Sequence, residues 1–253
     1  MTLTVDLNAD MGESFGAWKM GDDAALLDIV TSANIACGFH AGDPDVMFDT
    51  MRRAVAGNVG IGAHPGFDDL AGFGRHRRDV PRASLANQVR YQVGAAQAMA
   101  RAAGGALRHL KLHGALANMA SEDADLARVC YEAALSVAPD LRIMVLAETA
   151  QQRAAEAIGC AWVGEIFADR AYDDDATLVD RSQPGAVIHD PRIAGPRIAD
   201  MVRKGAIVTE SGREIPARID TICLHGDTAT AVEIARSVRR ALEEAGISVQ
   251  TFT

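Results

Sequence analysis

Runs of lysine and arginine, a long apolar segment and paired cysteines are all absent from this chain of 253 residues. Without a basic cluster, and with a net charge of -9, the protein is not expected to bind nucleic acid or an anionic membrane surface. No stretch approaches the roughly eighteen uninterrupted apolar residues of a membrane span. The opening MTLTVDLNAD reaches Asp6 and Asp10 too early to be a signal peptide.

Cysteine usage points to a reducing compartment. The four cysteines are scattered and include no CxxC pair, so we expect buried thiols, with no disulfide framework and no cysteine-based zinc site. A cytoplasmic location is therefore predicted. Nor does the chain contain an HExxH, GK[ST] or GxGxxG motif, so no nucleotide loop is expected in it.

Short β-rich runs alternate with long helical patterns along the whole chain, and this alternation is typical of a parallel sheet. Seven such units in about 250 residues favour a closed α/β barrel of seven parallel strands, with an open doubly wound sheet as the alternative. We expect one domain over residues 1–253, with a small β-hairpin inserted at 206–218 around Ser211 and Gly212. Strands are predicted at 2–8, 29–37, 59–64, 107–113, 142–146, 161–167 and 221–225, and helices at 44–57, 81–103, 122–137, 148–159, 190–204 and 227–245.

The first strand carries an unusual polar face. Side chains two positions apart share a face, so Asp6, Asn8 and Asp10 should lie opposite the apolar set of Leu3, Val5, Leu7 and Ala9. If the apolar set packs against helices, the polar set points into the barrel. Buried carboxylates are costly unless they have partners, so this face is predicted to serve function.

Histidines stand where strands end. His40, His64, His113 and His225 each follow a predicted strand, and the carboxyl ends of barrel strands are where barrel enzymes keep their active sites. Lys111 shares the face of His113, and both are expected to point into a wet cavity, where truncation would remove no core packing. His109 lies deeper and is expected to be a hydrogen-bonded core histidine. Gly60 and Gly62 share the face of His64 and are expected to leave space below its ring. The charged side chains of the loop 72–79 are expected to be solvated.

The loops beyond the sixth strand supply further candidates. Glu165, Asp169 and Arg170 follow each other there, and RSQPG at 181–185 presents Arg181. A pair of arginines can grip a substrate carboxylate with a fork of donors. Imidazoles and carboxylates together suit proton transfer, but they also suit a zinc-like or manganese-like cation, and spacing alone does not decide between these.

Several long motifs resemble the LamB/YcsF family over nearly the whole chain. They read DLNADMGES (6–14), SANIACGFHAGDP (32–44), IGAHPGFDDLAGFGR (61–75), HLKLHGAL (109–116), EIFADRAY (165–172), LVDRSQPGAV (178–187) and CLHGD (223–227). The resemblance implies a seven-stranded β/α barrel similar to polysaccharide deacetylases. It also implies the activity of the A subunit of a prokaryotic ATP-dependent 5-oxoprolinase, an enzyme that converts 5-oxo-L-proline, ATP and water to L-glutamate, ADP and phosphate.

In that family the ATP is a co-substrate of a complex, and separate subunits B and C are thought to activate the lactam by phosphorylation. The residues expected to form the catalytic site here are Asp6, Asn8, Asp10, His40, His64, Lys111, His113, His225 and Asp227, with Glu165, Asp169, Arg170 and Arg181 binding substrate.

The chain departs from the family pattern in two places, which leaves the identity of the lactam open. It has KLHGALAN where KPHGALYN is usual, and HGDTATA where HGDGPHA is common. Two other functions remain: a metal-dependent, deacetylase-like hydrolase acting alone, and a regulatory subunit without catalysis. For His40 and His64 we favour acid and base roles over cation binding, because opening a lactam needs an activated water and a protonated nitrogen.

Overall fold

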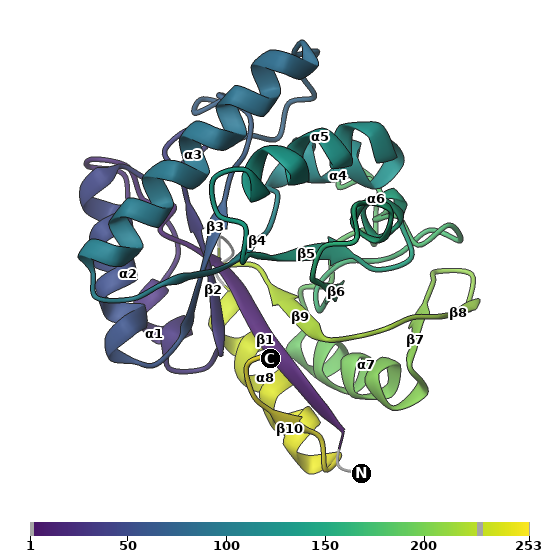
Figure 1. The fold of residues 1–253 in the computed structure, drawn as a ribbon. Helices are drawn as coiled ribbons and strands as arrows, with labels where there is room; N and C mark the ends of the chain where they lie inside the picture. Colours follow the sequence, from purple (N-terminus) through teal and green to yellow (C-terminus); the bar gives the residue numbers. More distant parts are fainter. Residues whose placement is uncertain (1–2, 227–229, 253) are drawn as a thin grey trace.

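Seven parallel strands close into a barrel. The computed structural model describes residues 3–226 and 230–252. Each strand pairs with the next along the chain, and the last pairs with the first, with Asp6 opposite Thr221. The barrel is therefore closed, as expected, and the open sheet is excluded (Figure 1). The barrel strands are β1 (Thr4–Met11), β2 (Ser32–Ala36), β3 (Gly60–His64), β4 (Leu107–Leu110), β5 (Arg142–Leu146), β6 (Trp162–Phe167) and β9 (Thr221–Leu224).

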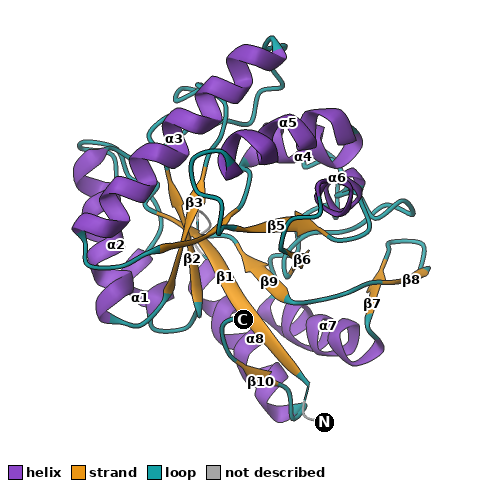
Figure 2. Ribbon diagram, in the orientation of Figure 1, coloured by secondary structure: helices purple, strands orange, loops and turns teal. Residues whose placement is uncertain are grey.

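Helices surround the strands on the outside (Figure 2). Their ends follow the sequence signals: Asp43 accepts a hydrogen bond from the amide of Val46 ahead of Pro44, and Gly159 and Gly205 take left-handed conformations where helices stop. None of the described helices is long and apolar enough to cross a membrane. The helices are α1 (Asp23–Leu27), α2 (Pro44–Ala56), α3 (Arg82–Ala102), α4 (Gly114–Glu122), α5 (Ala124–Leu135), α6 (Ala150–Ile158), α7 (Pro191–Lys204) and α8 (Ala231–Glu244).

Three elements were not predicted. The short α1 and the two-residue strand β10 (Ser248–Val249), which pairs with the start of β1, are too brief to leave a periodic pattern. Helix α4 begins directly after His113, because Gly114 adopts a φ of +55° and turns the chain at once. Strand β4 accordingly ends at Leu110, three residues earlier than predicted, whereas β1 continues three residues further, to Met11.

The predicted hairpin is present. Strands β7 (Ala206–Val208) and β8 (Glu214–Pro216) pair antiparallel as a separate two-stranded sheet, and they stand outside the barrel beside α7 (Figure 1). The turn includes Gly212 with a φ of +84°. This sheet contributes none of the residues that line the rim cavity described below, so it is a decoration of the barrel.

The two faces of β1 divide as predicted. Val5, Leu7 and Ala9 are buried in the apolar layer between strands and helices, although Leu3, before the strand, is half exposed and lies outside that layer. Asp6 is fully buried in the barrel, where the hydroxyls of Thr31, Ser32 and Thr221 donate to its carboxylate at 2.6, 2.7 and 2.5 Å. Burial raises the pKa of Asp6 to about 6, against the opposing effect of these hydrogen bonds.

A buried amide chain continues this interior network upward from Asp6. Asn8 donates to the hydroxyl of Thr221 at 2.8 Å, and Asn34 donates to Asn8 and to Asp10 at 2.7 and 2.9 Å. His109 in turn donates from Nε2 to Oδ1 of Asn34 at 2.7 Å, so it is a hydrogen-bonded core histidine as expected, although its buried Nδ1 has no hydrogen-bond partner among the described residues. The interior of the barrel is thus a connected polar network rather than an apolar core.

The space beside Gly62 is not free for His64, contrary to the sequence interpretation, because the His109 ring fills it. A Cβ at Gly62 would lie 2.0 Å from Nε2 of His109. We therefore expect Gly62→Ala to lower the free energy of unfolding by about 3 kcal/mol, the upper range for forced overpacking. The matched control is Gly60→Ala, whose nearest side-chain contact would be Ser32 Oγ, at 3.4 Å. Chemical denaturation of both variants tests this, and equal stabilities would contradict it.

Candidate active site

A cavity of about 450 Å³ opens at the carboxyl ends of the barrel strands. The side chains that the sequence predicts at this rim mostly end or follow a barrel strand. They meet because the carboxyl ends of parallel barrel strands lie on the same side of the barrel. Asp6, Asn8 and His40 do not line the cavity; the first two lie below it in the interior network, and Asp227 lies outside the described residues. The predicted residues that do line it are Asp10, His64, Lys111, His113, Arg170, Arg181 and His225.

Lys111 is the centre of a buried ionic cluster at the floor of this cavity. Its ammonium lies 2.8 Å from Oδ1 of Asp10, 3.1 Å from Oε1 of Glu165 and 2.9 Å from Sγ of Cys223. Burial alone would lower the pKa of Lys111, but the two carboxylates outweigh it and raise that pKa well above its usual range. Lys111 is only 4% exposed, so its surroundings are not the wet ones that the sequence suggested.

The two carboxyl groups beside Lys111 respond differently. Burial would raise the pKa of Asp10, but His64 and Lys111 hold it well below its ordinary value, so Asp10 is ionised. Burial raises the pKa of Glu165, and Lys111 offsets only part of that rise. Glu165 therefore belongs to the ionic cluster under the cavity and is not exposed for direct contact with a substrate.

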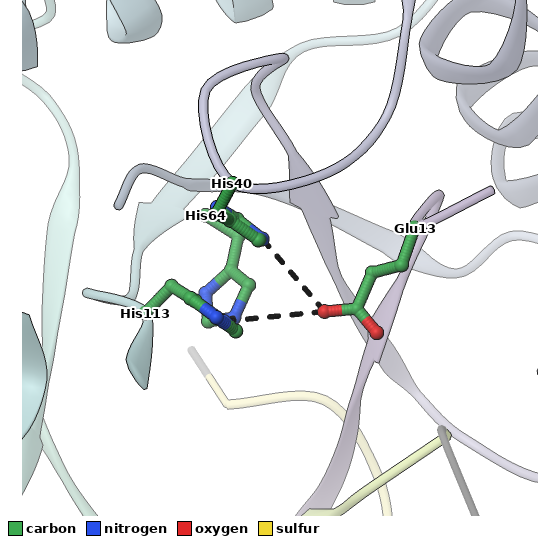
Figure 3. A group of neighbouring side chains, drawn as sticks. All are labelled: Glu13, His40, His64 and His113. Atoms are coloured by element: carbon green, nitrogen blue, oxygen red, sulfur yellow. Dashed lines mark hydrogen bonds and ion pairs between the residues drawn. The ribbon is translucent and has the colours of Figure 1, made fainter. Parts of the chain in front are cut away.

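Three of the rim histidines gather around Glu13 (Figure 3). The His40 and His113 rings stack in parallel, 3.6 Å between centroids, and His64 stands nearly perpendicular to both. Oε1 of Glu13 lies 3.8 Å from Nε2 of His40 and 3.9 Å from Nδ1 of His113. Burial lowers the pKa of His40 and of His113 well below the ordinary value, and neighbouring histidines add to this, so both are neutral near pH 7.

The ligand atoms of Glu13, His40, His64 and His113 all lie within 4.8 Å of one another, so this group could hold a divalent cation. A second group of this kind consists of Asp10, Cys223 and His225. The ammonium of Lys111 already contacts Asp10 and Cys223 there, and a cation would have to compete with it. The histidine group is therefore the stronger candidate.

His225 forms a separate acid–base pair at the cavity wall. Its Nδ1 lies 2.8 Å from both carboxylate oxygens of Asp169, and its Nε2 accepts from Arg181 Nη2 at 3.1 Å. Burial would raise the pKa of Asp169, but His225 and the two arginines outweigh it and lower that pKa, so Asp169 is ionised. Asp169 thus orients the ring, whereas the sequence suggested that it binds substrate directly, and Nε2 is left facing the cavity.

The two predicted arginines have different environments. Arg170 is buried, and it donates to the carbonyl oxygens of Ala186 and Val179, so it holds its own loop in place. Burial, with the nearby Arg181, lowers the pKa of Arg170 to about 10. Arg181 is exposed at the cavity wall and is the better placed of the two to reach a substrate carboxylate.

Sequence reasoning missed Glu13, Phe73 and Cys223. Glu13 lies in the DLNADMGES stretch, three residues after Asp10, so its signal was present, but strand parity does not extend past Gly12, whose φ is +67°. The charged side chains of the loop 72–79 are exposed, as expected, but the loop also reaches the site: the carbonyl of Phe73 accepts from Nε2 of His113 at 2.8 Å, and Arg75 lines the cavity. This loop covers the histidine group.

A closed β/α barrel whose ionisable side chains meet at the carboxyl rim is the arrangement of β/α-barrel enzymes. The catalytic domain of a peptidoglycan N-acetylglucosamine deacetylase from Eubacterium rectale shares this fold, with a TM-score of 0.53 at 8% identity, covering all of this chain and 90% of that one. This likeness confirms the deacetylase type of barrel and concerns the fold alone.

Relatives of much higher identity define the family. A sequence profile of the LamB/YcsF family matches residues 5–253. The 5-oxoprolinase A subunit of Ruegeria pomeroyi is 69% identical over 248 residues, 98% of either chain. The lactam utilization protein of Thermus thermophilus superposes with a TM-score of 0.92 at 42% identity, covering 99% of this chain and 100% of that one. The chain belongs to the LamB/YcsF family, as its motifs predicted.

Proposed function

We propose that this chain is the lactam-binding subunit of an ATP-dependent 5-oxoprolinase and that it hydrolyses 5-oxo-L-proline, or a closely related lactam, to the open amino acid. The observation that carries the proposal is the rim cavity, where a buried ammonium, an oriented His–Asp pair and an exposed arginine face one space. Relatives named as the 5-oxoprolinase A subunit and as a lactam utilization protein support the substrate class.

The cavity residues suit the steps that opening a cyclic amide requires. A lactam carbonyl gains negative charge when water attacks it, and the ammonium of Lys111 can stabilise that charge in a site with little water. Nε2 of His225 accepts a hydrogen bond in this structure, so it can take the proton of the attacking water, with Asp169 stabilising the resulting imidazolium. Arg181 can bind the substrate carboxylate.

We assign supporting roles to the remaining predicted residues. Asp10 holds Lys111 in place, and Asp6 and Asn8 fix Asp10 from below through Asn34 and Thr221. His40 and His64 stay candidates for acid and base roles, as the sequence suggested, and His113 and Asp227 keep their places among the candidate catalytic residues.

ATP enters the proposal as a co-substrate of the complex rather than of this chain. The sequence contains no nucleotide loop, and the lettered subunit name of the relatives implies other subunits. We propose that subunits B and C phosphorylate the lactam with ATP, releasing ADP, and that this chain adds water to the phosphorylated ring, so that ring opening yields glutamate and inorganic phosphate. All four cysteines are free thiols, which fits our proposed location in the cytoplasm.

The division of labour predicts that the isolated chain turns over 5-oxoproline negligibly, even with ATP. Adding subunits B and C should give ATP-dependent formation of glutamate, because activation then precedes the attack of water. Coupled measurement of glutamate and phosphate, with and without each partner, tests this. Robust turnover by the chain alone would contradict the proposal.

A second function is supported by one observation, the group of three histidines and Glu13 that could hold a cation. A metal-dependent amide hydrolase acting alone would need neither ATP nor partners. Its signature would be ATP-independent hydrolysis by the isolated chain that a chelator abolishes.

A further inference from the structure

Two backbone carbonyls fix the tautomers of His64 and His113. Nδ1 of His64 lies 2.9 Å from the carbonyl oxygen of Lys111, and Nε2 of His113 lies 2.8 Å from that of Phe73. A carbonyl oxygen only accepts, so each of these nitrogens must carry a proton. In neutral rings the remaining nitrogens, Nε2 of His64 and Nδ1 of His113, therefore carry lone pairs.

Those two lone pairs face each other. Nε2 of His64 and Nδ1 of His113 are 3.0 Å apart, a separation that normally requires a hydrogen between the atoms. Two carboxylates add negative charge to the same place, since Oδ2 of Asp10 lies 3.4 Å from His64 Nε2 and Oε1 of Glu13 lies 3.9 Å from His113 Nδ1. Four acceptor atoms thus converge where a positive charge would stabilise them all.

His40 supplies an independent observation. It is fully buried, and within residues 3–226 and 230–252 neither of its ring nitrogens has a hydrogen-bond partner. Leaving a buried polar group unsatisfied costs about 1–3 kcal/mol, so such a group calls for a partner. Its Nε2 lies 3.8 Å from Oε1 of Glu13, on the side of the ring group where the other acceptors converge (Figure 3).

We propose that Nε2 of His64, Nδ1 of His113 and the Glu13 carboxylate bind a divalent first-row cation of the zinc type, with His40 offering a fourth nitrogen. Imidazole nitrogens with one carboxylate are the donors that Zn²⁺ and Co²⁺ accept, whereas Mg²⁺ and Ca²⁺ prefer oxygen alone. The carbonyls of Lys111 and Phe73 act as outer partners that orient the two ligand rings, a recurring feature of metal-bound histidines.

This geometry favours cation binding over the acid–base role that the sequence suggested for His64. The rival explanation is a single proton held between the two rings, with one of them an imidazolium. A proton would satisfy the contact between His64 and His113, but it would leave both nitrogens of His40 without a hydrogen-bond partner among the described residues. The proposal does not rest on lactam hydrolysis, because it concerns binding alone.

The test uses the full chain stripped of metal with a chelator and titrated with Zn²⁺ or Co²⁺ alone, without lactam or ATP. We expect one equivalent of Zn²⁺ per chain by calorimetry and elemental analysis, and visible d–d absorption bands with Co²⁺. His64→Ala and His113→Ala should each weaken binding by at least about 100-fold, since even outer partners of ligands are worth 10- to 100-fold. His189→Ala, which removes an imidazole away from the histidine group, should leave binding unchanged.

Binding of less than a tenth of an equivalent by the wild-type chain would overturn the proposal, as would unchanged affinity in both ligand variants. If those variants fail to fold, nitrogen-15 spectra of labelled histidines in the wild-type chain decide instead. Zn²⁺ should shift Nε2 of His64 and Nδ1 of His113 together. A doubly protonated ring that Zn²⁺ does not alter would establish the shared proton and refute the cation.

Discussion

Replacing Lys111 with alanine is expected to lower lactam hydrolysis by the assembled complex by at least about 100- to 1,000-fold, the usual effect of losing one oxyanion donor. It should also destabilise the fold, which the sequence did not suggest. The ammonium pairs with Asp10 and Glu165 inside the barrel, and breaking a buried pair from one side costs about 3–5 kcal/mol because a charge is left uncompensated.

The stability loss should depend on pH with a definite sign. Without the ammonium, the pKa of Glu165, which burial already raises, lies further above its unfolded value, so the folded variant binds more protons than the unfolded chain. The penalty is therefore greatest at neutral pH and shrinks as pH falls toward about 4, the unfolded range of a glutamate. Thermal unfolding of the wild-type chain and the variant between pH 5 and 8 measures it.

A double variant separates catalysis from stability. Lys111→Met with Glu165→Gln replaces the ammonium by an apolar side chain and removes one of the two buried charges, so it should recover much of the stability without recovering activity. A double variant that regained activity would show that Lys111 is structural only. A single variant as stable as the wild-type chain at pH 7 would contradict the buried pairing.

The fold was predictable because its signals are periodic and local. Alternation along β1 placed Asp6, Asn8 and Asp10 inside the barrel, and the carboxyl ends of parallel strands had to meet at one rim. Both inferences need only the two-residue period of a strand and the parallel order of the sheet.

The finer structure of the site depends on contacts between distant segments, and a single sequence does not carry these. The rule that strand ends converge does not say that Lys111 is enclosed by Cys223 and Glu165, from strands far along the chain. Nor does it show that the loop carrying Phe73 closes over His113, or that Glu13 turns toward the histidines after Gly12. Each of these depends on loop conformation rather than on periodicity.

The cavity has two chemically distinct sides joined by Asp10. One carboxylate oxygen of Asp10 contacts Lys111 at 2.8 Å, and the other lies 3.4 Å from His64. The acid–base pair of His225 and Asp169 stands apart from the histidine group, because His225 follows β9 and Asp169 lies in the loop after β6. A mutation that disrupts the His225–Asp169 pair should therefore leave cation binding by the histidine group unchanged.

Asp169→Asn is expected to lower kcat by about 100- to 10,000-fold with little change in KM, within the range seen when the carboxylate behind a catalytic histidine becomes an amide. The side-chain amide of asparagine can donate to Nδ1 of His225, which would move the ring proton to Nε2. That nitrogen now accepts from Arg181 at 3.1 Å, so a proton there would oppose the arginine and could no longer take one from water.

Steady-state kinetics of the assembled complex tests this, with Asp140→Asn as the matched control because Asp140 is exposed and lies after α5, away from the rim cavity. The Zn²⁺ affinity of Asp169→Asn should equal that of the wild-type chain, since the proposed ligands lie on the other side of the cavity. Disruption of such a pair normally costs far more than twofold in kcat. A kcat within about twofold of wild type would therefore show that His225 does not act as the base. The base would then be sought among the histidines around Glu13.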